Sequence, residues 1–210
     1  MKARGLALAV AGLLAAAPPL HAEGFTLAAF GGYFDMLNAK DSAKAVFDGS
    51  SGGVTYGGEV GYRFKHHFSV TGRVDYFKKD GERVFVASPG APVFPLGHPL
   101  SVKILPFDLN FGYHFGDGAL RPYVGAGAGL VSYKEESTVA GVTTSNSETK
   151  FGARFFAGAE YGRGAWRFAA EAAYSLVPDT IGLGGVSQIY GEKDIGGVTV
   201  VGKVIFFFGK

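Results

Sequence analysis

Residues 150–177, KFGARFFAGAEYGRGAWRFAAEAAYSLV, consist of two runs of alternating character joined by a Gly-Arg-Gly turn. In the first run Phe151 and Phe155 share one parity, whereas Arg154 and Glu160 share the other. The second run repeats this alternation. A period of two predicts two β-strands, and their length of about 11 residues suits a tilted strand that crosses a bilayer.

The polarity of the two faces indicates the kind of sheet. A soluble barrel places apolar side chains inside, whereas a membrane barrel inverts this arrangement, because lipid rejects Arg and Lys near its midplane by about 2–4 kcal/mol. We therefore expect Arg154 and Glu160 to face a lumen. The shortest register for the hairpin pairs Tyr161 with Trp166 and Glu160 with Arg167.

Residues 1–22 predict a cleaved secretory signal peptide, since Lys2 and Arg4 precede an apolar run that ends in the small-residue pattern Leu20-His21-Ala22. Without this segment the 20 Lys and Arg fall to 18 and equal the 18 Asp and Glu. The remaining unit, 23–210, is formally neutral, which argues against a nucleic-acid-binding protein. With no Cys in the sequence, disulfides and thiolate chemistry are excluded.

Eight strands can be placed in residues 23–210, and no second domain is indicated. They are 25–34, 54–64, 67–78, 100–115, 120–134, 150–161, 166–177 and 197–208. Short turns near 65–66, 116–119 and 162–165 alternate with long segments at 35–53, 79–98, 135–148 and 178–194. Short turns at one end and long loops at the other are typical of an eight-stranded antiparallel up-and-down transmembrane β-barrel with both termini periplasmic.

The strand at 100–115 contains an ambiguity. Leu100, Val102 and Ile104 alternate with Ser101 and Lys103, so the apolar residues of its first half share the parity of the polar residues of its second half. Either a bulge near Pro106 resets the register, or the strand projects beyond the lipid and turns apolar side chains inward. The sequence leaves both interpretations open.

Residues 121–130, RPYVGAGAGL, and the closing VVGKVIFFFGK resemble the small eight-stranded outer-membrane barrels, a group that includes opacity-type surface antigens and barrels similar to outer membrane protein A. The resemblance implies a place in the bacterial outer membrane, with outer-membrane lipid, periplasmic chaperones and the barrel-assembly machinery as partners. In that family an aromatic residue usually ends the last strand and is read during assembly. Val204, Phe206 and Phe208 match this signal, although the chain continues to Gly209 and Lys210.

Charged side chains collect on the predicted lumen face. They are Glu59, Arg63, Arg73, Asp75, Asp108, His114, Lys150, Arg154, Glu160, Arg167, Glu171 and Lys203. The interior of an eight-stranded barrel is wide enough only for its own side chains, so we expect a paired network, with Glu59 opposite Arg73. The alternative is a gated polar path in which broken pairs admit ions.

Catalysis and metal binding find little support in the sequence. His66, His67 and His98 lack the spacing of metal ligands, and no metal or cofactor is predicted. No His and Ser lie two residues apart on an outward face, so a lipid A-modifying enzyme is the least favoured class.

The long segment 79–98 is unusually apolar for a loop, and Phe85, Val93, Phe94 and Leu96 are candidate contact residues. We expect a structural or surface-interaction protein whose loops contact a host partner or a small hydrophobic ligand. A narrow channel for small or hydrophobic solutes is the alternative.

Overall fold

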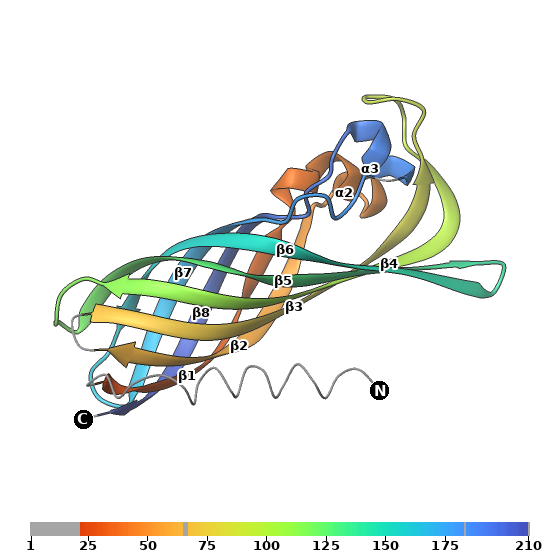
Figure 1. Ribbon diagram of the computed structural model, residues 1–210. Coiled ribbons are helices and arrows are strands. Elements are labelled where there is room, and N and C mark those ends of the chain that lie inside the picture. The colour runs from red at the N-terminus through yellow and green to blue at the C-terminus, as the bar shows by residue number, and fades with distance from the viewer. Residues whose placement is uncertain (1–21, 65–66, 183, 210) are drawn as a thin grey trace.

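The computed structural model describes residues 22–64, 67–182 and 184–209. In these ranges eight antiparallel strands follow one another around a closed barrel, and the first strand pairs with both the second and the last (Figure 1). The predicted all-β barrel is confirmed. No helix in the described part of the chain is long and apolar enough to cross a membrane. The predicted signal peptide, apart from Ala22, lies outside the described residues.

Short helical segments lie only in the connections between the first and second strands and between the seventh and eighth strands of the described part of the chain. The strands are β1 (Ala22–Asp35), β2 (Gly52–Phe64), β3 (Phe68–Phe85), β4 (Phe94–His114), β5 (Leu120–Val139), β6 (Val142–Tyr161), β7 (Trp166–Leu176) and β8 (Gly197–Gly209). The helical segments are η1 (Leu37–Ala39), α2 (Lys40–Val46) and α3 (Gly185–Tyr190).

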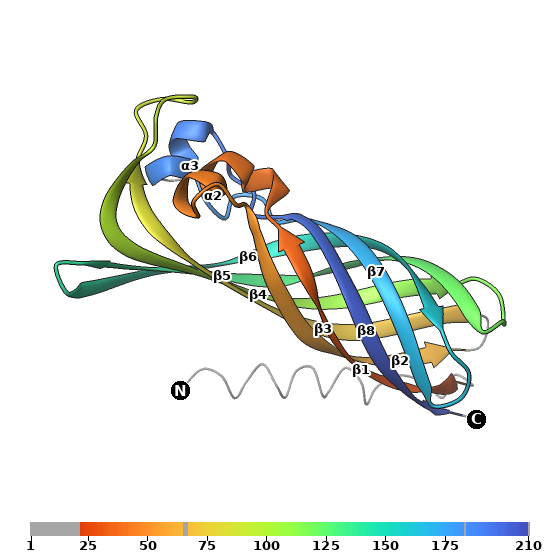
Figure 2. The ribbon, with the colours of Figure 1, turned by 180° about the vertical axis from the view of Figure 1, so that it is seen from behind.

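The two ends of the barrel differ. The short connections at 115–119 and 162–165 lie at the end where the chain terminates, and we call it the turn end. The predicted turn at 65–66 falls outside the described residues. The helices and the long β3–β4 and β5–β6 hairpins lie at the opposite loop end, as both ribbon views show (Figures 1 and 2). This asymmetry agrees with the prediction from the sequence.

The outward face of the barrel is apolar. Near the turn end, aromatic rings of neighbouring strands contact one another in edge-to-face pairs, including Phe68 with Tyr113 (centroids 5.1 Å apart) and Trp166 with Phe206 (4.9 Å). Such a girdle is typical of the water-lipid boundary of membrane barrels. The alternation read from the sequence thus forms a lipid-facing wall.

Two segments predicted as loops, 79–98 and 135–148, are largely strand. β3 and β4 stay paired as far as Phe85 and Phe94, and β5 and β6 as far as Val139 and Val142. The β5–β6 turn consists of Ala140 and Gly141, both with positive φ, a geometry that joins strands tightly. These hairpins therefore leave the barrel as ordered extensions.

Beyond the barrel rim, β6 has a neighbour on one side only. β7 pairs with β6 from Ala153 to Tyr161, whereas β5 pairs with β6 along its whole length. Residues 142–152 of β6 therefore form a free edge of the extended sheet.

The ambiguity in β4 is resolved in favour of inward-turned apolar residues. The β4–β5 register passes through Pro106 without a shift, so no bulge is present there. Leu100, Val102 and Ile104 are buried, with 7%, 4% and 3% of their surfaces exposed. Because proline has no N–H to donate, the β3–β4 ladder is interrupted beside Pro106 between the pairs Val74–Phe107 and Phe77–Ile104.

The predicted β6–β7 register is wrong by two residues. Tyr161 pairs with Phe168 and Glu160 with Ala169. The turn is wider because Gly162 and Gly164 both adopt positive φ, and Ala165 accepts a hydrogen bond from Phe207 of β8 instead of pairing with β6. A shift of two residues preserves the face of every side chain, so Arg167 still points inward.

Apolar side chains and helices fill the loop end. A buried cluster, which we call the apolar plug, joins inward residues of β1, β3, β4 and β5 to η1, α2 and the β7–β8 connection. Its members are Phe34, Met36, Ala39, Ala43, Phe47, Phe77, Leu100, Val102, Ile104, Val131, Tyr133, Val177 and Ile195. Gly81 of β3 lies directly against Val46 and Phe47, which fixes the β3–β4 hairpin to α2.

Glycines on β5 make room for inward side chains. A Cβ on Gly125 would overlap the Phe156 ring and the backbone oxygen of Phe111, whereas a Cβ on Gly202 would meet no atom within 4 Å. We predict that Gly125→Ala lowers the free energy of unfolding by about 1–3 kcal/mol, since an overpacked interior must shift. Gly202→Ala is the matched control, and equal urea midpoints for the two variants, followed through Trp166 fluorescence, would contradict this account.

Candidate functional site

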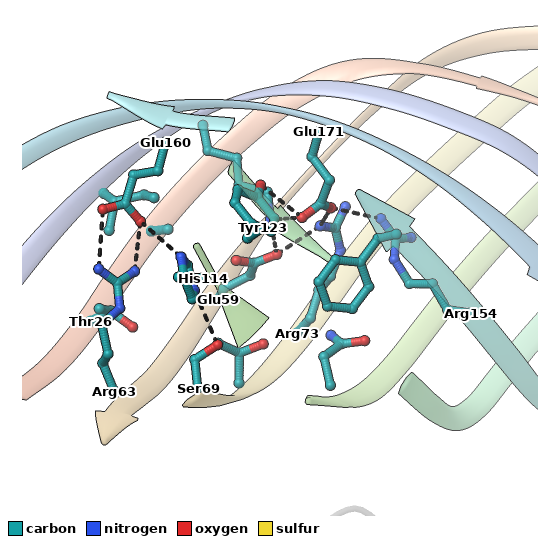
Figure 3. Close-up of a pocket in the computed structure, with 16 residues that line it drawn as sticks. Thr26, Glu59, Arg63, Ser69, Arg73, His114, Tyr123, Arg154, Glu160 and Glu171 are labelled. Atoms are coloured by element: carbon teal, nitrogen blue, oxygen red, sulfur yellow. Dashed lines mark hydrogen bonds and ion pairs between the residues drawn. The ribbon is translucent and has the colours of Figure 1, made fainter. Parts of the chain in front are cut away.

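A single carboxylate, Glu160, organises the lumen near the turn end, and only 1% of its surface is exposed. Arg63 donates two hydrogen bonds to it, of 3.1 and 2.6 Å. Arg121 and Arg167 each donate one more, of 2.8 and 3.1 Å. We call these four residues the turn-end cluster. Figure 3 shows Arg63 directed at Glu160, with His114 between this pair and Ser69.

A second group, the middle cluster, lies deeper in the barrel around Glu171 and Arg73. Arg73 donates to Glu171 (3.0 Å), to Glu59 (2.7 Å) and to both oxygens of Asp75. Lys203 bridges Glu59 and Glu171. Arg154 and Tyr123 also donate to Glu171, at 3.1 and 3.0 Å. Every carboxylate that these bonds reach is shared by more than one donor, or bound through both of its oxygens.

Aromatic rings complete the packing of the cations. The Arg73 guanidinium lies 3.8 Å above the centre of the Phe30 ring, and that of Arg167 lies 3.9 Å above the Phe207 ring. Both rings come from inward positions of strands whose other face contacts lipid. Contact with an aromatic face offsets part of the hydration that a buried guanidinium loses.

The structure brings ten of the twelve predicted lumen residues together. They belong to the two clusters or, for His114, lie beside them. They are Glu59, Arg63, Arg73, Asp75, His114, Arg154, Glu160, Arg167, Glu171 and Lys203. Asp108 is the eleventh, and it lines a cavity together with Arg154. Lys150, expected inside, lies beyond the rim and pairs with Glu148 at 3.6 Å.

The space left inside is small. A cavity of about 50 Å³ lies between the two clusters, and another of about 40 Å³ lies between the middle cluster and the apolar plug. Each has room for a few water molecules and not for an organic solute. Leu100, Val102 and Ile104 fill the plug instead of lining a pocket of ligand size.

Hydrogen bonds hold the loops over the plug. The carboxylate of Glu192, beyond α3, accepts bonds of 2.9 Å from the backbone N–H groups of Asp41 and Ser42 at the start of α2. Asp194 accepts the N–H of Val177, and Tyr174 donates to Asn38 at 2.7 Å. The β1–β2 and β7–β8 connections thus form one lid.

The predicted contact residues lie on the extended β3–β4 hairpin. Phe85 and Phe94 face each other across the two strands, and 55% of each is exposed. Val93 and Leu96 are exposed beside them. Of the three residues matched to the assembly signal, Val204 and Phe208 are exposed and Phe206 is half-buried, on the outward face of β8.

The paired parts of both hairpins are polar where they leave the barrel. Lys103 of β4 and Lys134 of β5 each donate a 2.7 Å bond to Glu136. These two bonds lower the pKa of Glu136 to about 2, and the bond from Lys103 has the larger effect. The carboxylate therefore stays charged at neutral pH and joins β4 to β5 above the lipid.

Sequence reasoning missed several members of the lumen. Arg121 and Tyr123 carry the inward parity of β5, so strict use of the alternation would have identified both. Phe30 and Phe207 gave no such signal, because an aromatic residue in these strands suits either face.

In the described ranges, no three His, Asp or Glu side chains are placed to share a metal ion. Ser69 and His114 lie 3.2 Å apart, but both are inside the lumen and away from lipid.

Glu160 supplies the test of the buried network. We predict that Glu160→Gln lowers the free energy of unfolding by about 3–5 kcal/mol, because three guanidinium groups lose their shared counter-charge. Glu148→Gln, which breaks a partly exposed pair, is the matched control and should cost less than about 1 kcal/mol. Urea titration of both variants in detergent measures the difference, and similar losses would show that the network adds little.

Comparison with known proteins agrees with this architecture. The family model described as outer membrane protein beta-barrel domain matches residues 6–193. Among curated proteins no sequence match is found. Neisserial surface protein A superposes with a TM-score of 0.53 at 16% identity, over 88% of this chain and 96% of that one. Outer membrane protein W of Escherichia coli gives 0.48 at 14% identity, over 89% and 98%. At such identities the likeness shows the fold alone.

The match to the family model covers most of the sequence, and the lipid-facing wall, short turns and long hairpins are those of the family. The turn end is therefore periplasmic and the loop end extracellular. The chain belongs to the outer membrane protein beta-barrel family and lies in the bacterial outer membrane.

Proposed function

We propose that the protein is a non-conducting, non-enzymatic barrel that presents its β3–β4 and β5–β6 hairpins for contacts at the cell surface. The observation that carries this proposal is the contrast between a filled lumen and long ordered extensions. Charged clusters occupy the periplasmic and middle parts of the interior, and the apolar plug occupies the extracellular part. The hairpins, by comparison, stay paired well beyond the rim.

The β3–β4 hairpin carries the apolar part of the contact surface. Phe85, Phe94 and Leu96 expose about half of their surfaces near its tip, although this part of the chain lies beyond the lipid. An ordered strand pair keeps these side chains in place, because Gly81 packs against the C-terminal turn of α2. Apolar groups held on a rigid support lose little conformational entropy on binding. We infer an apolar surface on the partner.

A channel for small or hydrophobic solutes is the less supported candidate. The lumen cavities of about 50 and 40 Å³ would have to merge through the Arg73 network and then through the plug. Opening such a path breaks several buried charge pairs together, which is costly.

Conductance separates the two functions. We predict that the purified protein in planar bilayers gives no steady single-channel current, because paired charges and the apolar plug close the lumen. Voltage-clamp recording measures this, with a general porin as the positive control. Stable conductance steps that scale with protein concentration would contradict the proposal.

The contact surface has its own test. We predict that Phe85→Ser with Phe94→Ser reduces attachment of cells bearing the protein to an alkyl-coated surface several-fold, because the exposed aromatic pair is removed. Val142→Ser, at the tip of the other hairpin and also exposed, is the matched control. Surface display is measured in parallel with an antibody to an epitope tag. Equal attachment of both variants at equal display would show that the β3–β4 tip does not make the contact.

A further inference from the structure

The turn-end cluster contains more positive than negative charge. Arg63, Arg121 and Arg167 converge on one carboxylate, that of Glu160. Among the side chains that the structure describes, this leaves an excess of two positive charges at a place where Glu160 and Arg63 are almost fully buried. Buried cations without a counter-charge are costly, so the imbalance calls for a further negative group.

The neighbouring middle cluster does not supply that group. Its carboxylates Glu59, Asp75 and Glu171 are already hydrogen bonded by Arg73, Arg154 and Lys203. The hydrogen bonds of the two clusters do not cross over between them in the described part of the chain. The positive excess is therefore carried by the turn-end cluster, although Glu59 and Glu171 of the middle cluster line the cavity between the two.

Three buried nitrogens around Glu160 have no hydrogen-bond partner among the described residues: Nε of Arg63, Nε of Arg121 and Nδ1 of His114. Nδ1 of His114 is a donor in the tautomer whose Nε2 accepts a bond from Ser69. Arg63 and His114 are both more than nine-tenths buried, and both line the cavity of about 50 Å³ between the clusters. Figure 3 shows the two side chains next to each other at one side of this cavity. Water could accept these hydrogen bonds, but water cannot balance the charge.

We propose that the periplasmic part of the lumen binds one small monovalent inorganic anion, of the size of chloride, against Arg63 and His114. A chloride ion is only slightly larger than the water molecules for which the cavity has room. Charge-assisted N–H donors hold an anion more strongly than neutral donors. The side chain of Arg121, which also contacts Glu160, is 15% exposed.

The first test compares chloride with gluconate, an anion too large for the cavity, at equal ionic strength. Unfolding of the detergent-solubilised protein in urea is followed by Trp166 fluorescence. Once chloride exceeds its dissociation constant, each tenfold rise should multiply the folded-to-unfolded ratio by about ten, as expected for one site. Gluconate should give no such slope. Identical responses to both anions would overturn the proposal.

The second test locates the ion. Crystals grown in sodium bromide should show one anomalous peak in contact with Arg63 and His114. Arg63→Gln should remove both this peak and the chloride response, whereas the control Lys103→Gln, on the extracellular extension, should keep both. A peak elsewhere, or a chloride response retained in Arg63→Gln, would overturn the site. If Arg63→Gln does not fold, the comparison of anions and the bromide peak, both measured on the wild-type protein, still decide whether an anion binds at this site.

Discussion

The structure depends on one constraint: a charge that lipid rejects must find its counter-charge inside an eight-stranded barrel. The interior of such a barrel is too narrow for bulk water, so solvation has to come from other side chains. Arg73 illustrates the solution. It reaches three carboxylates and rests on the ring of Phe30. Strand pairing, glycine placement and the choice of inward aromatics all follow from fitting such groups together.

This constraint also explains the layering of the lumen. Charges gather where the wall faces lipid, because there the inward face is the only place for a polar side chain. Beyond the lipid the wall faces water on the outside, and the interior becomes an ordinary apolar core. Val102 and Ile104 mark this change on β4, where the inward residues turn from polar to apolar on either side of Pro106. The barrel thus has a polar interior, as in membrane barrels, from the turn end to its middle, and an apolar core, as in soluble proteins, at the loop end.

Much of the fold could be predicted from alternation alone, since period and polarity are local properties. The inward position of Glu59, Arg73 and Glu171 follows from them, as does the closed ring of strands. The register of Tyr161 could not be predicted, because it depends on how Gly162 and Gly164 widen a turn. Nor could the hairpin extensions, whose Thr and Ser residues suit a loop as well as an exposed strand. The convergence of three arginines on Glu160 is a property of the closed barrel, because the residues come from four strands.

The free part of the β5–β6 hairpin has a consequence for how this protein changes over time. Beyond the pair Leu100–Ser137, the two strands contact only each other in the ladder, and their turn at Ala140 and Gly141 touches no part of the barrel wall. Substitutions and insertions there leave the lumen, the lid and the lipid-facing wall unaltered. The sequence of this tip can therefore vary freely, whereas the rest of the chain must still meet the demands of membrane insertion.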